Sequence, residues 1–276
     1  MEITITKEDF ERSLPVGKRA GNDVYEKVKT EIDNSLNMVR NVYRGEAADD
    51  RLETVTSLQT AFKDVVCLTG TLNSLRQLDL VLTPTGFGVV SNNNVAPASK
   101  QRVDSLEAAL RTQLLRRESE LFYGLRSENW GASPQARRAI PYFFDLFYFF
   151  TDSSFRTIAN AQKWDDIQSP LREAWIEIRR YMGDEMLSEL LDAYRKADDN
   201  RMVKYHLVIE QIQLIMDRWT IYANATMHKP EWRLLFSMME SDEVNFNKWK
   251  ESSAYKLTHY EHFQNTKEST AFLFNG

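Results

Sequence analysis

Two histidines near the end of the sequence have the spacing that comes closest to a metal site. His259 and His262 are three positions apart, so both imidazoles would lie on one face of a helix. Glu261 would point away from that face, and the zinc-protease motif needs histidines four apart with Glu directly after the first. A third ligand would have to come from elsewhere in the chain. Two exposed polar residues are the simpler interpretation, and a metal-dependent hydrolase built on this pair stays an alternative.

Paired acidic residues occur at three places, each of which resembles the start of a helix. The pairs are Asp49–Asp50, Asp165–Asp166 and Asp198–Asp199. Negative charge is favourable there because the helix dipole places partial positive charge at the N-terminus.

Gly86 and Gly88 lack the third glycine and the strand–turn–helix setting of a dinucleotide-binding loop. We therefore predict no catalytic, cofactor-binding or metal-binding residue.

Cys67 is the only cysteine of the chain. No disulfide can form within the chain, and no cluster of thiolates can bind a metal. This usage fits a reducing compartment, or a particle that is assembled in one. The neighbouring residues Val65 and Val66 indicate that the thiol is buried on a helix face.

The densest basic region begins at Arg111. Arg111, Arg116 and Arg117 are the candidates for contact with phosphate groups, for instance those of DNA in a channel. Nearby glutamates such as Glu118 offset most of this charge, and the net charge of −5 does not favour a dedicated nucleic-acid binder. A solvated helix face with ion pairs is the simpler interpretation, so any DNA contact is expected to be incidental.

The composition allows a large folded core and does not indicate a membrane protein. Of the 276 residues, 42% are hydrophobic and 12% are aromatic, which is enough for one large domain or two ordinary ones. The first nine residues lack the basic and then apolar pattern of a signal peptide. The longest apolar run, Ile140–Phe150, is too short to span a bilayer and contains Asp145. We expect no membrane partner.

Apolar residues recur every three or four positions through most of the chain, which predicts long amphipathic helices. Thr6 and Ser99 are expected to cap helices, the first with Asp9 as the acid of a capping box. Gly45 is expected to stop a helix, Gly183 to interrupt another, and Gly70 to mark a kink or a helix end. Pro170 is expected at the first position of a helix. The expected helices span residues 22–43, 50–78, 100–125, 169–194 and 201–225, with another that starts at 229.

One segment interrupts the helical pattern. Leu80–Ser91 is rich in β-branched residues and has a Pro-Thr-Gly turn in its middle, so it predicts two short strands in a hairpin, or one bulged strand. The fold class that follows is mainly α, a helical bundle with one small β-hairpin or short antiparallel sheet. We predict an N-terminal helical region, 1–130, with the hairpin at 80–91, and a C-terminal helical region, 131–276. One continuous domain remains an alternative.

The stretch LVLTPTGFGVVSNNNVAPAS, residues 80–99, resembles a segment of uncharacterised structural proteins of phages and prophages of Bacteroides and relatives, including crAss-like phages. The later SPLREA at 169–174, followed by YMGDEML at 181–187, is similar to head–tail connector or adaptor proteins of that group. The resemblance implies a virion role and supplies no catalytic residue. It also implies assembly in the bacterial cytoplasm, or a cytoplasmic protein if the gene is a prophage remnant.

The resulting hypothesis is a non-enzymatic structural protein that forms homo-oligomers, such as rings, and contacts portal or tail components. Phe87, Val89, Phe272 and Phe274 are the candidate interaction residues. Three of them are aromatic, and aromatic side chains are enriched at subunit interfaces. A bacterial cytosolic protein-interaction domain without a viral role is the main alternative.

Overall fold

The computed structural model is mostly helical, as the sequence predicts. The larger part of the chain is described. The described residues are 3–14, 22–78, 80–83, 86–89, 99–142, 161–222, 229–242 and 244–259.

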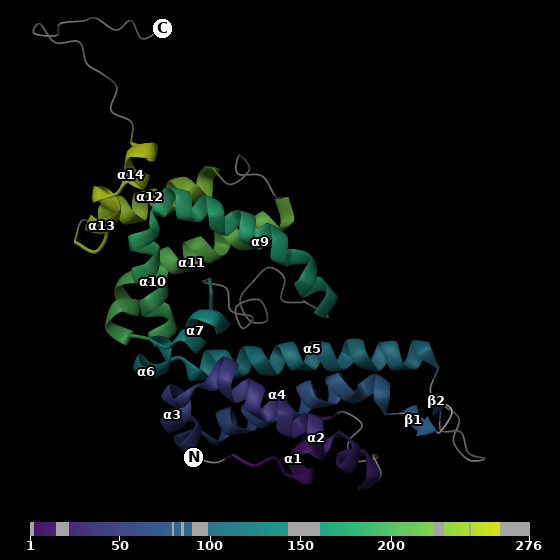
Figure 1. Cartoon of the computed structure of the whole chain (residues 1–276). Helices are drawn as coiled ribbons and strands as arrows, with labels where there is room; N and C mark the ends of the chain where they lie inside the picture. The colour runs from purple at the N-terminus through teal and green to yellow at the C-terminus, as the bar shows by residue number, and fades with distance from the viewer. Residues whose placement is uncertain are drawn as a thin grey trace, which may run out of the picture.

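Among the described residues, the N-terminal body is built mainly from four helices. They are α1 (Lys7–Ser13), α2 (Asn22–Val39), α4 (Thr56–Ser74) and α5 (Lys100–Leu125). The helix α4 lies in the middle of this body and packs against α1, α2 and α5 (Figure 1). Its many buried residues explain this place, since a helix that is apolar over most of its circumference must be covered on several sides.

The helix α2 continues into a π-helical turn, η2 (Arg40–Arg44), and ends at Gly45. Gly45 has a φ of 60°, so glycine provides the stop that the sequence predicts there. Two short segments, η3 (Glu46–Ala48) and α3 (Asp49–Thr54), lead into α4.

The prediction of one helix over 50–78 is wrong, because the chain breaks at Val55 between α3 and α4. Val55 adopts an extended conformation with φ −114° and ψ 98°, which a β-branched residue tolerates well. Gly70 does not end the helix, because α4 runs through it to Ser74 and then into η4 (Leu75–Gln77). A side chain at Gly70 would meet the backbone of Ile32 at 2.8 Å, so this glycine allows α2 and α4 to approach closely.

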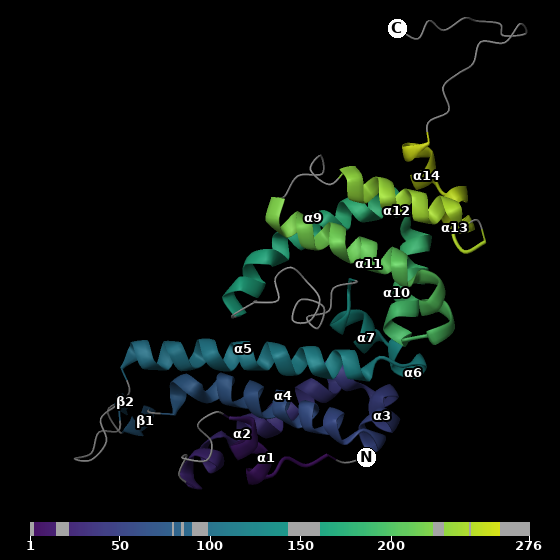
Figure 2. The same ribbon diagram turned by 180° about the vertical axis from the view of Figure 1, so that it is seen from behind.

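Two short strands follow the N-terminal body. The strand β1 (Leu80–Thr83) pairs antiparallel with β2 (Gly86–Val89), with Leu80 opposite Val89 and Thr83 opposite Gly86. Both views place this pair beyond the ends of α4 and α5, away from the other helices (Figures 1 and 2).

The C-terminal body lies on the other side of α5 (Figure 1). Two short helices, α6 (Glu128–Gly131) and α7 (Pro134–Ala139), connect the two bodies. Gly131 lies so close to the backbone of Arg195 that a Cβ atom would come within 2.6 Å of it. The same short helix also contacts η3, so the segment at the predicted boundary of 130 and 131 packs against both bodies. The other helices among the described residues are α9 (Ala161–Met182), α10 (Asp184–Lys196), α11 (Asp199–Tyr222), α12 (Lys229–Ser241), α13 (Asn247–Glu251) and α14 (Ser253–Thr258).

The predicted helix start at Pro170 is wrong, because Pro170 lies inside α9. The buried residues Ile167, Leu171, Ala174 and Ile178 form one face that runs past the proline, so packing against α11 outweighs the missing backbone donor. Gly183, with a φ of 77°, does interrupt the helix as predicted.

Buried apolar residues form one cluster that includes residues from both bodies. Trp130, Trp249, Phe10, Phe62 and Phe246 are among its largest members with almost no exposed surface. No helix among the described residues is both long and apolar enough to cross a bilayer.

Candidate functional site

The three candidate phosphate-binding arginines all lie on α5, and carboxylates occupy two of them. Arg111 donates to Oε1 of Glu107 at 3.0 Å, and Glu107 also accepts from Arg76 at 2.5 Å. Arg116 is exposed. These partners would compete with any phosphate for the same guanidinium groups, and contact with DNA stays a prediction.

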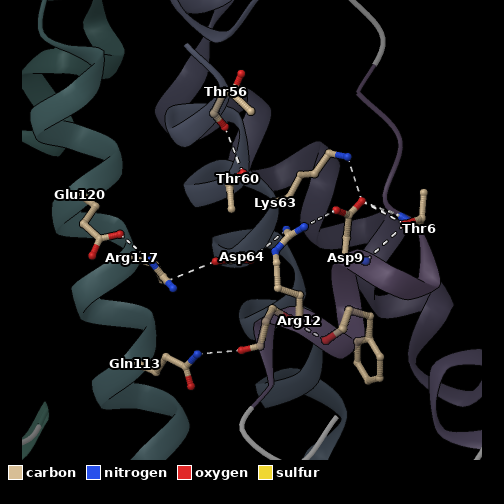
Figure 3. A network of polar contacts seen from close by, with 12 residues as sticks. Thr6, Asp9, Arg12, Thr56, Thr60, Lys63, Asp64, Gln113, Arg117 and Glu120 are labelled. Atoms are coloured by element: carbon tan, nitrogen blue, oxygen red, sulfur yellow. Dashed lines mark hydrogen bonds and ion pairs between the residues drawn. The ribbon is translucent and has the colours of Figure 1, made fainter. Parts of the chain in front are cut away.

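Arg117 belongs to a network that joins three helices (Figure 3). Its Nε atom lies 3.2 Å from Oδ2 of Asp64 on α4, and its terminal nitrogen lies 2.6 Å from Glu120. Asp64 also accepts from Arg12 of α1 at 3.1 Å. Asp64 is only 1% exposed, so a buried carboxylate with two partly exposed arginines connects α1, α4 and α5.

Asp9 forms the second carboxylate of this network. It accepts from Lys63 at 2.8 Å and from Arg12 at 2.9 Å, and it also caps α1 together with Thr6. Burial alone would raise the pKa of Asp9, but hydrogen bonds from Lys63, Thr6 and Arg12 lower that pKa overall. Burial dominates at Asp64, whose pKa is raised although Arg12 and Arg117 oppose the shift.

An open cavity of about 640 Å³ lies along α5 beside this network. Thr112 at its edge accepts a hydrogen bond from the backbone of Ala161, at the start of α9, at 3.1 Å. Its lining therefore lies where the two bodies meet, and it is mixed in character. The lining residues are Ala108, Ala109, Thr112, Gln113, Arg116, Arg117 and Glu120.

Glu118 is the described carboxyl group with the clearest departure from ordinary behaviour. Burial raises its pKa to about 7, although a hydrogen bond from Tyr43 acts in the opposite direction. Tyr43 lies in the π-helical turn, its ring packs on Phe122 at 4.9 Å, and burial beside Glu118 raises its pKa to about 12. Trp130 donates its indole N–H to the carbonyl of Tyr43 at 2.9 Å. This cluster anchors α5 to the end of α2.

His259 lies just after α14 and does not form the predicted two-histidine face among the described residues. Its Nε2 atom lies 2.5 Å from Glu240, and its ring stacks on Tyr255 with a centroid distance of 3.8 Å. His262 lies outside the described residues. Across the described part of the chain, no group of three His, Cys, Asp or Glu side chains is placed to hold a metal ion.

Only two of the four candidate interaction residues lie in the described part of the chain. Phe87 and Val89 lie in β2, at the far end of the N-terminal body. Phe272 and Phe274 lie outside the described residues. Cys67 is buried, as predicted, and burial raises the pKa of its thiol to about 12, so this cysteine is a poor nucleophile.

The position of Asp64 and Glu118 among apolar residues of their helices is a signal that residue type alone does not give. Asp64 is spaced from Ala61 and Leu68 so that all three share a buried helix face. Glu118 lies on the same face of α5 as the half-buried Leu114 and the buried Leu121. An acidic residue within an apolar stripe is expected to be paired or to have an altered pKa.

Residues 18–138 match the model of a family of unknown function (DUF6712). The matched segment contains α2, the paired strands and α5, so it covers most of the N-terminal body. No curated protein and no solved structure is significantly similar to the chain.

Proposed function

We propose that the protein is a non-enzymatic structural subunit of a bacterial virus particle, and that it acts as a head–tail connector or adaptor. The sequence resemblance at residues 80–99 motivates the viral role. Assembly would occur in the bacterial cytoplasm, through contacts between copies and with portal or tail components.

The observation that carries the proposal is the position of the β1–β2 hairpin. Its two strands lie beyond the ends of α4 and α5 (Figure 2), where they can reach another molecule. The hairpin includes Phe87 and Val89, the residues expected at an interface. A stable base supports this element, because the buried carboxylate Asp64 ties α4 to α5 and to α1.

The fixed charges of α5 fit the same role. Arg111 and Arg117 are neutralised within the subunit by Glu107, Asp64 and Glu120. A surface with internally paired charges does not repel further copies of itself, whereas a basic strip would do so at low salt.

The proposal is tested by locating the protein in purified particles. Quantitative mass spectrometry of virions is expected to find it in a constant ratio to the portal protein, and the two purified proteins are expected to form a complex. Absence from particles, together with no binding to the portal, would instead support the bacterial protein-interaction domain. The genes beside its own give an independent check, since portal, terminase and capsid genes are expected there.

A further inference from the structure

The two-stranded sheet has two outer edges that no other described strand covers. Its strand order is β1–β2 only, so one row of backbone donors and acceptors faces outward on each side. A two-stranded hairpin is marginally stable by itself in water. Some further contact is therefore needed to keep this element ordered.

The turn of the hairpin makes this requirement stronger. The register pairs Thr83 with Gly86 and leaves only Pro84 and Thr85 between the strands. Two-residue hairpins prefer the primed turn types, whose first central residue has a positive φ. The sequence Pro84-Thr85 lacks the Asn, Asp or Gly that such turns prefer, and proline cannot adopt a positive φ. The sequence between the strands therefore does not itself favour a hairpin.

The edges also lack the features that usually prevent strand pairing between molecules. Neither LVLT nor GFGV contains a charged residue or a proline. Edge strands of soluble monomers are commonly blunted by lysine, proline or bulges. Strands of this composition are expected to be covered in the working form of the protein.

The register identifies the backbone groups that would make the contact. In a hairpin closed by two residues, Thr83 and Gly86 bond to each other, and hydrogen-bonded pairs alternate from there. The amides and carbonyls of Phe87 and Val89 then point away from β1, and those of Leu80 and Leu82 point away from β2.

We propose that β2 of one subunit pairs antiparallel with β1 of a second copy, so that neighbouring hairpins form a continuous sheet. A head-to-tail contact uses both edges of every hairpin, whereas a two-fold contact between identical strands leaves one edge of each open. Repetition of a head-to-tail contact closes into a ring when the rotation permits. The inference rests on the proposed structural role and names the partner surface as this same chain.

The first experiment compares the mass of the full-length protein and its variants by light scattering and native mass spectrometry. Wild type is expected at a multiple of 32.2 kDa. The double variant Phe87→Lys with Val89→Lys places positive charge on the β2 edge. It is expected to be a 32.2 kDa monomer whose circular dichroism shows the same helix content as wild type. Val244→Lys is the matched control, because Val244 is an apolar residue 84% exposed on the C-terminal body.

A second variant separates loss of contact from loss of the hairpin itself. Pro84→Asn with Thr85→Gly introduces the Asn-Gly turn that favours hairpins and is expected to assemble at least as well as wild type. Adding the two lysines to this stabilised variant is still expected to give monomers. Assembly that survives the lysines in both backgrounds, or a monomeric wild type, would overturn the inference.

Crosslinking tests the direction of the contact. Leu82→Cys and Phe87→Cys proteins, mixed and treated with a short bismaleimide, are expected to give a crosslinked dimer of the two variants. Buried Cys67 supplies no background reaction. A dimer that forms as readily from Phe87→Cys alone would indicate a two-fold contact and refute the head-to-tail form. Presence in virions is measured separately, so hairpin pairing can fail while the viral role stands.

Discussion

The raised pKa of Glu118 predicts a stability that falls as the pH rises from acidic to slightly alkaline values. The ordinary pKa of 4.5 applies in the unfolded chain, and burial raises it to about 7 in the folded protein. Between these two values the folded state binds more protons than the unfolded state, so raising the pH favours unfolding. The substitution Glu118→Gln removes the titrating carboxyl group and keeps a side chain of the same size near Tyr43.

The magnitude follows from the two pKa values. The difference in proton binding between the folded and unfolded states lowers the free energy of unfolding, relative to a permanently neutral side chain. The loss caused by Glu118 is about 0.8 kcal/mol at pH 5 and about 3.3 kcal/mol at pH 8. The free energy of unfolding of Glu118→Gln minus that of wild type should therefore increase by about 2.5 kcal/mol between these pH values. Most of this change should occur between pH 5 and 7.

The assay is urea denaturation of both proteins, followed by circular dichroism, at intervals from pH 5 to pH 8. The contributions of all other titrating groups cancel in the difference between the two proteins. Glu120→Gln is the control, because it removes a carboxylate two residues away that is largely exposed and paired with Arg117. Parallel pH profiles for Glu118→Gln and wild type would refute the argument that burial controls this carboxyl group.

Four further substitutions test the packing and capping of the N-terminal body by urea denaturation. Gly70→Ala should destabilise by about 1–3 kcal/mol because its new methyl group meets the backbone of α2, whereas Gly124→Ala should cost less because it meets only a leucine side chain; equal costs would contradict this. Trp130→Phe should cost about 1 kcal/mol for the lost indole hydrogen bond, and no loss would mean that water replaces it. Thr6→Ala should cost about 1 kcal/mol through loss of the cap of α1, and a neutral result would show that this helix does not need it.

The sequence predicts helices well where their ends carry local signals. Residues 100–125 form α5 as predicted, because the Ser99 side chain caps its first turn by accepting a hydrogen bond from the backbone N–H of Arg102. Gly45 and Gly183 end helices as expected, since both adopt a positive φ.

The errors arise where tertiary packing outweighs a local signal. Pro170 favours a helix start, but the buried stripe on both sides of it keeps α9 continuous. Gly70 favours an interruption, yet its role is to admit the backbone of α2. Nothing local marks the break at Val55, which depends on how α3 and α4 pack.

The candidate site is predictable only in part for a similar reason. The sequence indicates that acidic residues offset the arginines of α5, and the ion pairs of Arg111 and Arg117 agree with that. Which carboxylate is buried depends on contacts between distant segments. Asp64 meets Arg12 from a position 52 residues away in sequence, a pairing that periodicity within one helix does not reveal.

The helix α5 has a mechanical consequence for the molecule. Its 26 residues form a rod about 39 Å long, with the hairpin near its first turn and α10 of the C-terminal body near its last (Figure 1). Arg126, just after the rod, donates to the carbonyl of Tyr194 at 2.8 Å and lies over the ring of the same residue. The rod therefore links the hairpin near one end to α10 near the other, and its packing against α4 and α9 limits how far it can tilt.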